Sequence, residues 1–108
     1  MIGPASAPLV AAAINRLTRP APLSRERLAR FAGRTALFRI GPVAVALTVQ
    51  TTGEVLPAQE AAAADLEVRI SPFLLPRLAA HDEAAYRDVE TLGDVEFAGE
   101  VAFLAKHL

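Results

Sequence analysis

The sequence has no cysteine and no tryptophan, and it has a single tyrosine and a single methionine among 108 residues. Without cysteine there is no disulfide, no thiolate nucleophile and no cysteine-ligated metal site. No window approaches the roughly 20 consecutive apolar residues that a membrane-spanning helix requires. The N-terminal stretch lacks the basic start of a secretory signal peptide. We therefore expect residues 1–108 to form one cytoplasmic domain.

Residues that carry chemistry are equally scarce. His81 precedes two acids, but three consecutive side chains point in different directions, and a zinc site needs three or four convergent ligands. His107 has no acid or nucleophile at helical spacing. Acidic pairs such as Asp65 and Glu67 have the spacing of a solvated strand face, and no glycine-rich phosphate loop is present. The sequence predicts binding rather than catalysis, with no catalytic residue, metal or cofactor.

The charges are unevenly distributed. Residues 1–53 hold seven arginines and one acid, a balance of +6, whereas residues 54–108 hold four bases and eleven acids, a balance of −7. Either the two halves attract each other, or the basic half meets anionic lipid headgroups or an acidic partner. Nucleic acid is a poor candidate partner because basic and aromatic residues do not interleave.

Helical patterns occupy residues 1–33. In the first, Leu9, Ala13 and Leu17 fall on one face, with Ser6 as the expected N-cap and Pro20 as the end. In the second, Ser24 is the expected N-cap and Gly33 the terminator. We expect two N-terminal helices.

Strand patterns follow. Residues 34–40 and 43–50 predict two strands joined by Gly41-Pro42, and residues 54–56 predict a third. Residues 43–50 alternate valine or leucine with alanine or threonine, so we expect this strand to be covered on both faces. Residues 58–64 predict a loop or one helical turn, and residues 65–70 a half-buried strand.

The remaining segments alternate again. Ser71-Pro72 opens a leucine-rich helix, Asp82 caps a short helix, and residues 95–98 predict a fifth strand ended by Gly99. Residues 100–108 predict a last helix without a C-terminal signal, so we expect the natural protein to continue beyond it.

Four passages resemble one known family. Residues 64–78 (ADLEVRISPFLLPRL) resemble the strand-to-helix passage of sterol-carrier-protein-like domains, and residues 93–100 (GDVEFAGE) look like the family's terminal strand and the start of its last helix. Residues 27–35 (RLARFAGRT) and 103–108 (FLAKHL) resemble its UbiJ branch, bacterial accessory factors of ubiquinone biosynthesis. Together the passages span nearly the whole chain.

The resemblance implies a fold that mixes helices and strands (α/β in the broad sense), of the α+β type. A five-stranded, mostly antiparallel sheet would pack against helices around an apolar cavity, and the branch's C-terminal helical extension would be absent here. It also implies a non-catalytic accessory factor that binds isoprenoid lipids. Such a factor would present polyprenylated phenol intermediates of ubiquinone biosynthesis to other proteins of that pathway in the bacterial cytoplasm. It would touch the inner membrane peripherally.

The residues that would line such a cavity follow from strand parity and helix position. They are expected at Val45, Leu47, Val49, Leu66, Val68, Ile70, Phe73, Leu74 and Leu104. Ordinary core packing is the alternative for most of them. The alternative function is a protein-interaction scaffold of the same complex without an interior ligand.

Overall fold

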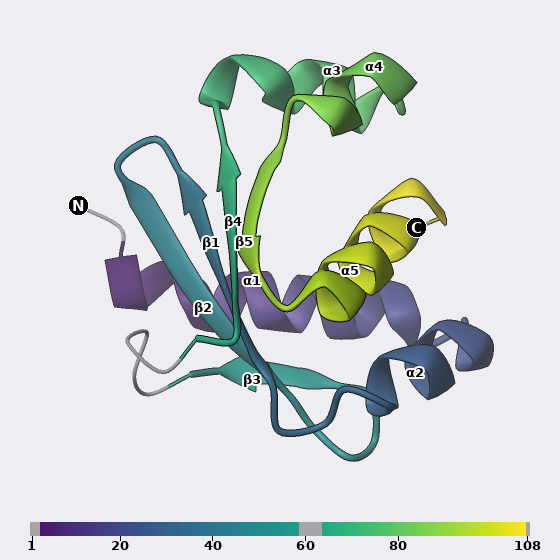
Figure 1. Ribbon diagram of the computed structural model, residues 1–108. Coiled ribbons are helices and arrows are strands. Elements are labelled where there is room, and N and C mark those ends of the chain that lie inside the picture. Colours follow the sequence, from purple (N-terminus) through teal and green to yellow (C-terminus); the bar gives the residue numbers. More distant parts are fainter. Residues whose placement is uncertain (1–2, 59–63, 108) are drawn as a thin grey trace.

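A single five-stranded sheet organises the chain. The computed structural model describes residues 3–58 and 64–107, with strands in the order β3-β2-β1-β4-β5 (Figure 1). The strands are β1 (Thr35–Ile40), β2 (Val43–Val49), β3 (Val55–Pro57), β4 (Leu66–Ile70) and β5 (Glu90–Gly93). The helices are α1 (Gly3–Thr18), α2 (Pro22–Ala29), α3 (Leu75–Ala79), α4 (Glu83–Arg87) and α5 (Val95–His107), and a 3-10 turn, η2 (Pro72–Leu74), precedes α3.

The sheet is mixed but mostly antiparallel. The pairs β1–β2, β2–β3 and β4–β5 are antiparallel, whereas β1 and β4 run parallel. Phe38 at the centre of β1 is paired with Val45 on one side and Val68 on the other. The expected α+β architecture is therefore confirmed.

The helices pack on one face of this sheet. Helix α1 lies against β2 and β3, and α5 lies against β4 and β5. Figure 1 shows α3 and α4 beyond the end of β4 and β5. The buried core joins Leu28 of α2 and Phe97 of α5 to the sheet. Among the described residues, no helix is both long and apolar enough to cross a bilayer.

Strand β2 is covered less completely than its pattern predicts. Val45, Leu47 and Val49 are buried in the core beneath the helices. Ala44, Ala46 and Thr48 face the opposite side and are half-buried. This second face is only half-covered by the described part of the chain, so the expectation that β2 is fully covered on both faces is wrong.

Helix α1 presents a different face to the sheet than predicted. Its buried residues are Ala7, Ala11 and Thr18, whose small side chains let the helix lie close to β2 and β3. Leu9 and Leu17 are 74% and 58% exposed. Ser6 lies inside the helix rather than at its cap, because α1 begins at Gly3.

The cap of α2 also differs from the prediction. Pro22 is the first helical residue and Ala21 precedes it, so Ser24 lies within the helix. A proline suits this position, because the first helical N–H groups have no partner within the helix. Gly33 does have the predicted positive φ, at 87°.

The predicted fifth strand at residues 95–98 is wrong, because this segment is the first turn of α5. The Asp94 carboxylate accepts a hydrogen bond from the Phe97 N–H at 3.1 Å, which starts a helix. The fifth strand is instead Glu90–Gly93. The last helix therefore begins at Val95 rather than at residue 100, and Gly99 lies inside it. Most of the loop predicted at residues 58–64 lies outside the described residues.

The uneven charge is largely neutralised between the two halves. Arg25 pairs with Glu54, Arg27 with Glu100, Arg34 with Asp94, and Arg39 with Glu67. The hydrogen bond from Arg27 to Glu100 raises the pKa of the guanidinium, which also lies 3.8 Å above the Phe103 ring. Mutual attraction of the halves therefore accounts for four of the seven arginines.

Candidate binding cavity

Two adjoining cavities lie between the sheet and α5. The smaller has a volume of about 220 Å³ and an entirely apolar lining. It is bounded by Ile14, Leu28, Ala36, Phe38, Leu47, Val49, Val55, Phe97, Val101, Leu104 and Ala105. Helices α1, α2 and α5 and strands β1, β2 and β3 all contribute to this lining.

The larger cavity has a volume of about 680 Å³ and reaches under α3 and α4. It is bounded by Phe38, Val68, Ile70, Leu75, Leu78, Ala79, Tyr86, Val89, Thr91, Val95, Ala98, Gly99, Val101, Ala102 and Ala105. Tyr86 and Thr91 are its only polar side chains among the described residues. Phe38, Val101 and Ala105 line both cavities, so the two spaces lie side by side beneath α5.

The residue sizes along α5 explain why space remains there. Phe97, Val101 and Leu104 recur at helical spacing and fill the interior beside the smaller cavity. Ala98, Ala102 and Ala105 form a neighbouring stripe of small side chains that faces the larger cavity. A stripe of alanines opposite Val68 and Ile70 cannot fill the distance between helix and sheet, so a hollow forms.

The structure distributes the predicted cavity residues among several environments. Leu47, Val49 and Leu104 line the smaller cavity, and Val68 and Ile70 line the larger one. Val45 and Leu66 are buried in the core but do not line either cavity.

Two predicted residues lie elsewhere. Phe73 is 89% exposed and Leu74 is half-buried, and neither lines a cavity. The reason is the turn η2. The Ser71 hydroxyl accepts a hydrogen bond from Phe73 N, and Pro72 fits against Gly41, where an added Cβ would lie 2.9 Å from its Cγ.

Several lining residues escaped the sequence reasoning. The small residues on one face of α5 were not predicted to line a cavity, because residues 95–98 were predicted to form a strand. A period-3.6 count from Phe97 would have revealed both faces of this helix. Tyr86 has no local signal beyond being the only tyrosine of the chain.

The electrostatics of the lining are suited to holding an apolar molecule. The residues whose pKa is shifted lie outside both linings. A hydrogen bond from Arg69 lowers the pKa of Glu67, and one from Arg77 lowers that of Asp82. In the described part of the chain, no cluster of three or more histidine or acidic side chains could hold a metal ion. His81 lies on the α3–α4 connection, and the side chain of His107 lies outside the described residues.

Comparison with solved structures finds the same backbone arrangement elsewhere. A domain described as a UbiJ-SCP2 ubiquinone synthesis protein aligns over 96% of this chain and 91% of its own, with 18% identity and a TM-score of 0.74. The chain has the sterol-carrier-protein fold. The apo sterol carrier protein 2 of Yarrowia lipolytica covers 94% of this chain and 90% of its own, with 14% identity and a TM-score of 0.53.

A third neighbour is the sterol carrier protein domain 2 of Helicoverpa armigera, which aligns over 91% of this chain and 84% of its own, with 13% identity and a TM-score of 0.54. No family model and no curated protein matches the sequence. The resemblance to sterol-carrier-protein-like domains is thus confirmed at the level of the fold. Within this fold, GDVEFAGE marks the junction of β5 and α5 rather than a strand.

Proposed function

We propose that this chain is a non-catalytic lipid-binding domain that holds polyprenylated intermediates of ubiquinone biosynthesis. The observation that carries the proposal is the pair of adjoining apolar cavities beneath α5. An isoprenoid tail gains about 25 cal/mol for each Å² of apolar surface that it removes from water. The sterol-carrier-protein fold and the UbiJ-SCP2 neighbour support this class of ligand.

A catalytic role has little support from the described lining. General acid–base catalysis requires a titratable side chain within hydrogen-bond reach of the reacting atom. Tyr86 is the one titratable side chain among the lining residues, and it has no carboxylate partner there. The domain would instead hand its ligand to the enzymes and other proteins of the pathway at the cytoplasmic side of the bacterial inner membrane.

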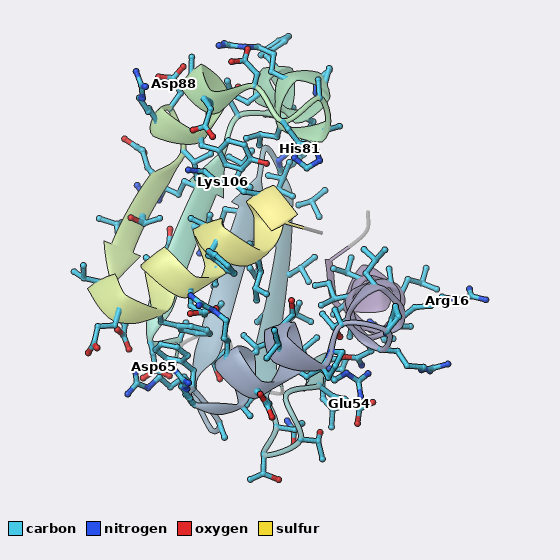
Figure 2. The ribbon with its side chains drawn as sticks, turned by 90° about the vertical axis from the view of Figure 1, so that its right-hand side faces the viewer. Arg16, Glu54, Asp65, His81, Asp88 and Lys106 are labelled. Carbon is cyan, nitrogen blue, oxygen red and sulfur yellow. The ribbon has the colours of Figure 1, made fainter. Side chains whose placement is uncertain are left out.

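Peripheral contact with that membrane is supported by one face of α1. Leu9 and Leu17 project outward from this helix, and Leu23 at the start of α2 is 73% exposed. Arg16 on α1 and Arg19 in the turn just after it are exposed, and neither has an ion-pair partner among the described residues. Figure 2 shows the labelled Arg16 pointing away from the sheet. Exposed leucines beside free arginines suit an anionic lipid surface.

Native mass spectrometry tests the proposed ligand class. The purified domain, incubated with a farnesylated benzoquinone, should show a one-to-one complex at micromolar concentrations. If only ligand-free protein is seen and no apolar probe is taken up, the scaffold alternative without an interior ligand is favoured.

A further inference from the structure

One end of the larger cavity differs chemically from the rest of the lining. Tyr86 of α4 reaches this end with its ring against the cavity and its hydroxyl between α3 and α5. Its Oη lies 3.4 Å from the carbonyl oxygen of Leu78 and 3.3 Å from that of Ala105. The Nδ1 atom of His81 lies 3.4 Å from the same Oη.

These three contacts compete for one hydroxyl. A tyrosine carries a single O–H proton, so it can donate fully to only one of the two carbonyls. The two distances to carbonyl oxygens exceed the usual range of O–H···O bonds, about 2.5–3.0 Å, and the distance to His81 Nδ1 exceeds the usual N···O range, about 2.7–3.2 Å. Ala105 lies in the last turn of α5, where carbonyls have no helical partner. The cluster is therefore loosely bonded and has spare hydrogen-bonding capacity.

A basic side chain completes the cluster. The Lys106 ammonium lies 5.3 Å from the centre of the Tyr86 ring and 3.5 Å from the Glu83 carboxylate. Figure 2 shows the labelled Lys106 and His81 near the region where α3 and α4 approach the end of α5.

The backbone at His81 ends helix α3 and sets the position of its ring. Among the described residues it is the one non-glycine residue with a positive φ, 56°. Such a conformation is uncommon outside glycine, although histidine tolerates it better than most residues. The N–H groups of His81 and Asp82 donate to the carbonyls of Leu78 and Arg77, which is the usual left-handed end of a helix, and this turn directs the His81 ring to Tyr86.

We infer that Tyr86, His81 and Lys106 bind the polar head of the ligand, a neutral aromatic ring bearing hydroxyl or carbonyl oxygens. This inference rests on the proposed function and adds an orientation to it. The head lies between α4 and α5, and the isoprenoid tail passes Phe38 and Val101 into the smaller, wholly apolar cavity. Tyr86 donates to the ring oxygen, and the Ala105 carbonyl accepts from a ring hydroxyl.

The charges nearby select a neutral ring over a phosphate. A phosphate site typically presents several arginines or lysines or a row of backbone N–H groups. Here the single lysine is already paired with Glu83, and Arg77 on α3 is already paired with Asp82 and Asp88. A phenol or quinone needs no cation of its own, and the side chains of Leu78 and Val89 offer apolar contact for its ring faces.

Three probes with the same tail separate the possible head groups. They are farnesyl hydroquinone, farnesyl diphosphate and the hydrocarbon farnesene, each measured by calorimetry with the full chain. The hydroquinone should bind about fivefold or more tightly than farnesene, because one net hydrogen bond has that effect. The diphosphate should bind no better than farnesene. Tighter binding of the diphosphate would overturn the choice of a neutral head.

Two conservative variants locate the site. Tyr86→Phe keeps the ring and removes only the hydroxyl, so it should abolish the preference for hydroquinone while leaving farnesene binding unchanged. His81→Asn tolerates a positive φ and should reduce the preference. Thr52→Val removes a hydroxyl at an exposed turn position outside both linings and serves as the control, with no expected change.

The only tyrosine in a tryptophan-free chain also provides a direct optical signal. A farnesylated benzoquinone bound head-first at Tyr86 should quench its fluorescence, whereas farnesene should not. If Tyr86→Phe weakens all probes equally or none, or if the quinone binds without quenching, the head site is overturned and lipid binding stands. If no probe binds the unmodified chain, the proposed function itself fails.

Discussion

Asn15 of α1 pairs with both backbone groups of Val55 on the edge strand β3. Its Nδ2 donates to the Val55 carbonyl at 2.9 Å, and its Oδ1 accepts from the Val55 N–H at 2.8 Å. A side-chain amide thus takes the place of a neighbouring strand at this edge. The contact holds α1 and β3 together at the wall of the smaller cavity, which Val55 lines.

Asn15→Ala should therefore destabilise the fold. It leaves two backbone groups of a buried residue unpaired, a loss of about 1–3 kcal/mol. Urea unfolding followed by circular dichroism measures this change. Arg16→Ala on the next, exposed position is the control and should stay within about 0.5 kcal/mol of the unmodified chain.

Two glycines should respond oppositely to the same substitution. Gly93 has a φ of 112°, and an added Cβ would lie 2.3 Å from the Asp65 carbonyl oxygen. Gly93→Ala should cost about 2 kcal/mol or more. Gly99 lies within α5, and an added Cβ would meet nothing within 4 Å. Gly99→Ala should stabilise by about 0.5–1 kcal/mol, because alanine favours helices.

Thermal melts of the two glycine variants test this account of the β5–α5 junction. A lower melting temperature for Gly93→Ala and a higher one for Gly99→Ala are expected. Equal shifts would contradict the placement of residues 95–107 in a helix.

Acid should weaken the ion pairs on the outer face of the sheet. Arg69 and Arg39 contact the same carboxylate oxygen of Glu67, at 2.6 and 3.2 Å. The pKa of Glu67 is lowered, mainly by the hydrogen bond from Arg69. A lowered pKa in the folded state stabilises the fold above the unfolded-state pKa, about 4.3 for glutamate. That contribution disappears as the pH falls through the lower, folded-state value.

Glu67→Gln should therefore reduce the pH dependence of unfolding below about pH 4.5. Denaturant midpoints measured at pH 7 and at pH 3 would show it. The variant should differ from the unmodified chain at pH 7, and the difference should shrink at pH 3. A difference that grows with acidity would contradict the assignment.

Membrane contact should depend on Arg16 of α1 and Arg19 in the turn just after it. The double variant Arg16→Gln/Arg19→Gln should bind anionic phosphatidylglycerol vesicles about tenfold more weakly, since each basic residue near the surface favours binding. Arg87→Gln on α4 removes a charge elsewhere and should have little effect. Flotation of the three proteins with vesicles gives the comparison, and equal flotation of all three would remove α1 from the contact.

Most of the fold could be predicted because local signals agree with tertiary packing. The alternation in 65–70 and the turn at Gly41-Pro42 both appear in the structure as β4 and the β1–β2 hairpin. The segment 95–98 failed because its alternation of valine and phenylalanine with polar residues also fits a helix. The cap at Asp94, which decides between them, depends on Gly93 fitting against Asp65.

The cavity was harder to predict than the strands. Strand parity identified Leu47, Val49, Val68 and Ile70 among the lining residues. It could not distinguish them from Val45 and Leu66, which face the same side but pack directly against other core residues. Whether a strand residue lines a cavity or packs against the core depends on where the helices lie, and the strand pattern does not predict this. The face of α1 was misjudged similarly, because the helix packs by its alanines rather than by its leucines.

Filling the cavity tests the central claim of lipid binding most directly. Ala105 is exposed and lines both cavities, so Ala105→Trp should place an indole in their common space with little cost in stability. Ala84→Trp makes the same change at an exposed position of α4 that lines neither cavity.

The chain has no other tryptophan, so a blue-shifted emission from Ala105→Trp reports that the indole is inside. Affinity for a farnesylated benzoquinone should then fall about tenfold or more, equivalent to about 1.4 kcal/mol, and stay unchanged in Ala84→Trp. Unchanged affinity in Ala105→Trp with a buried indole would contradict the account.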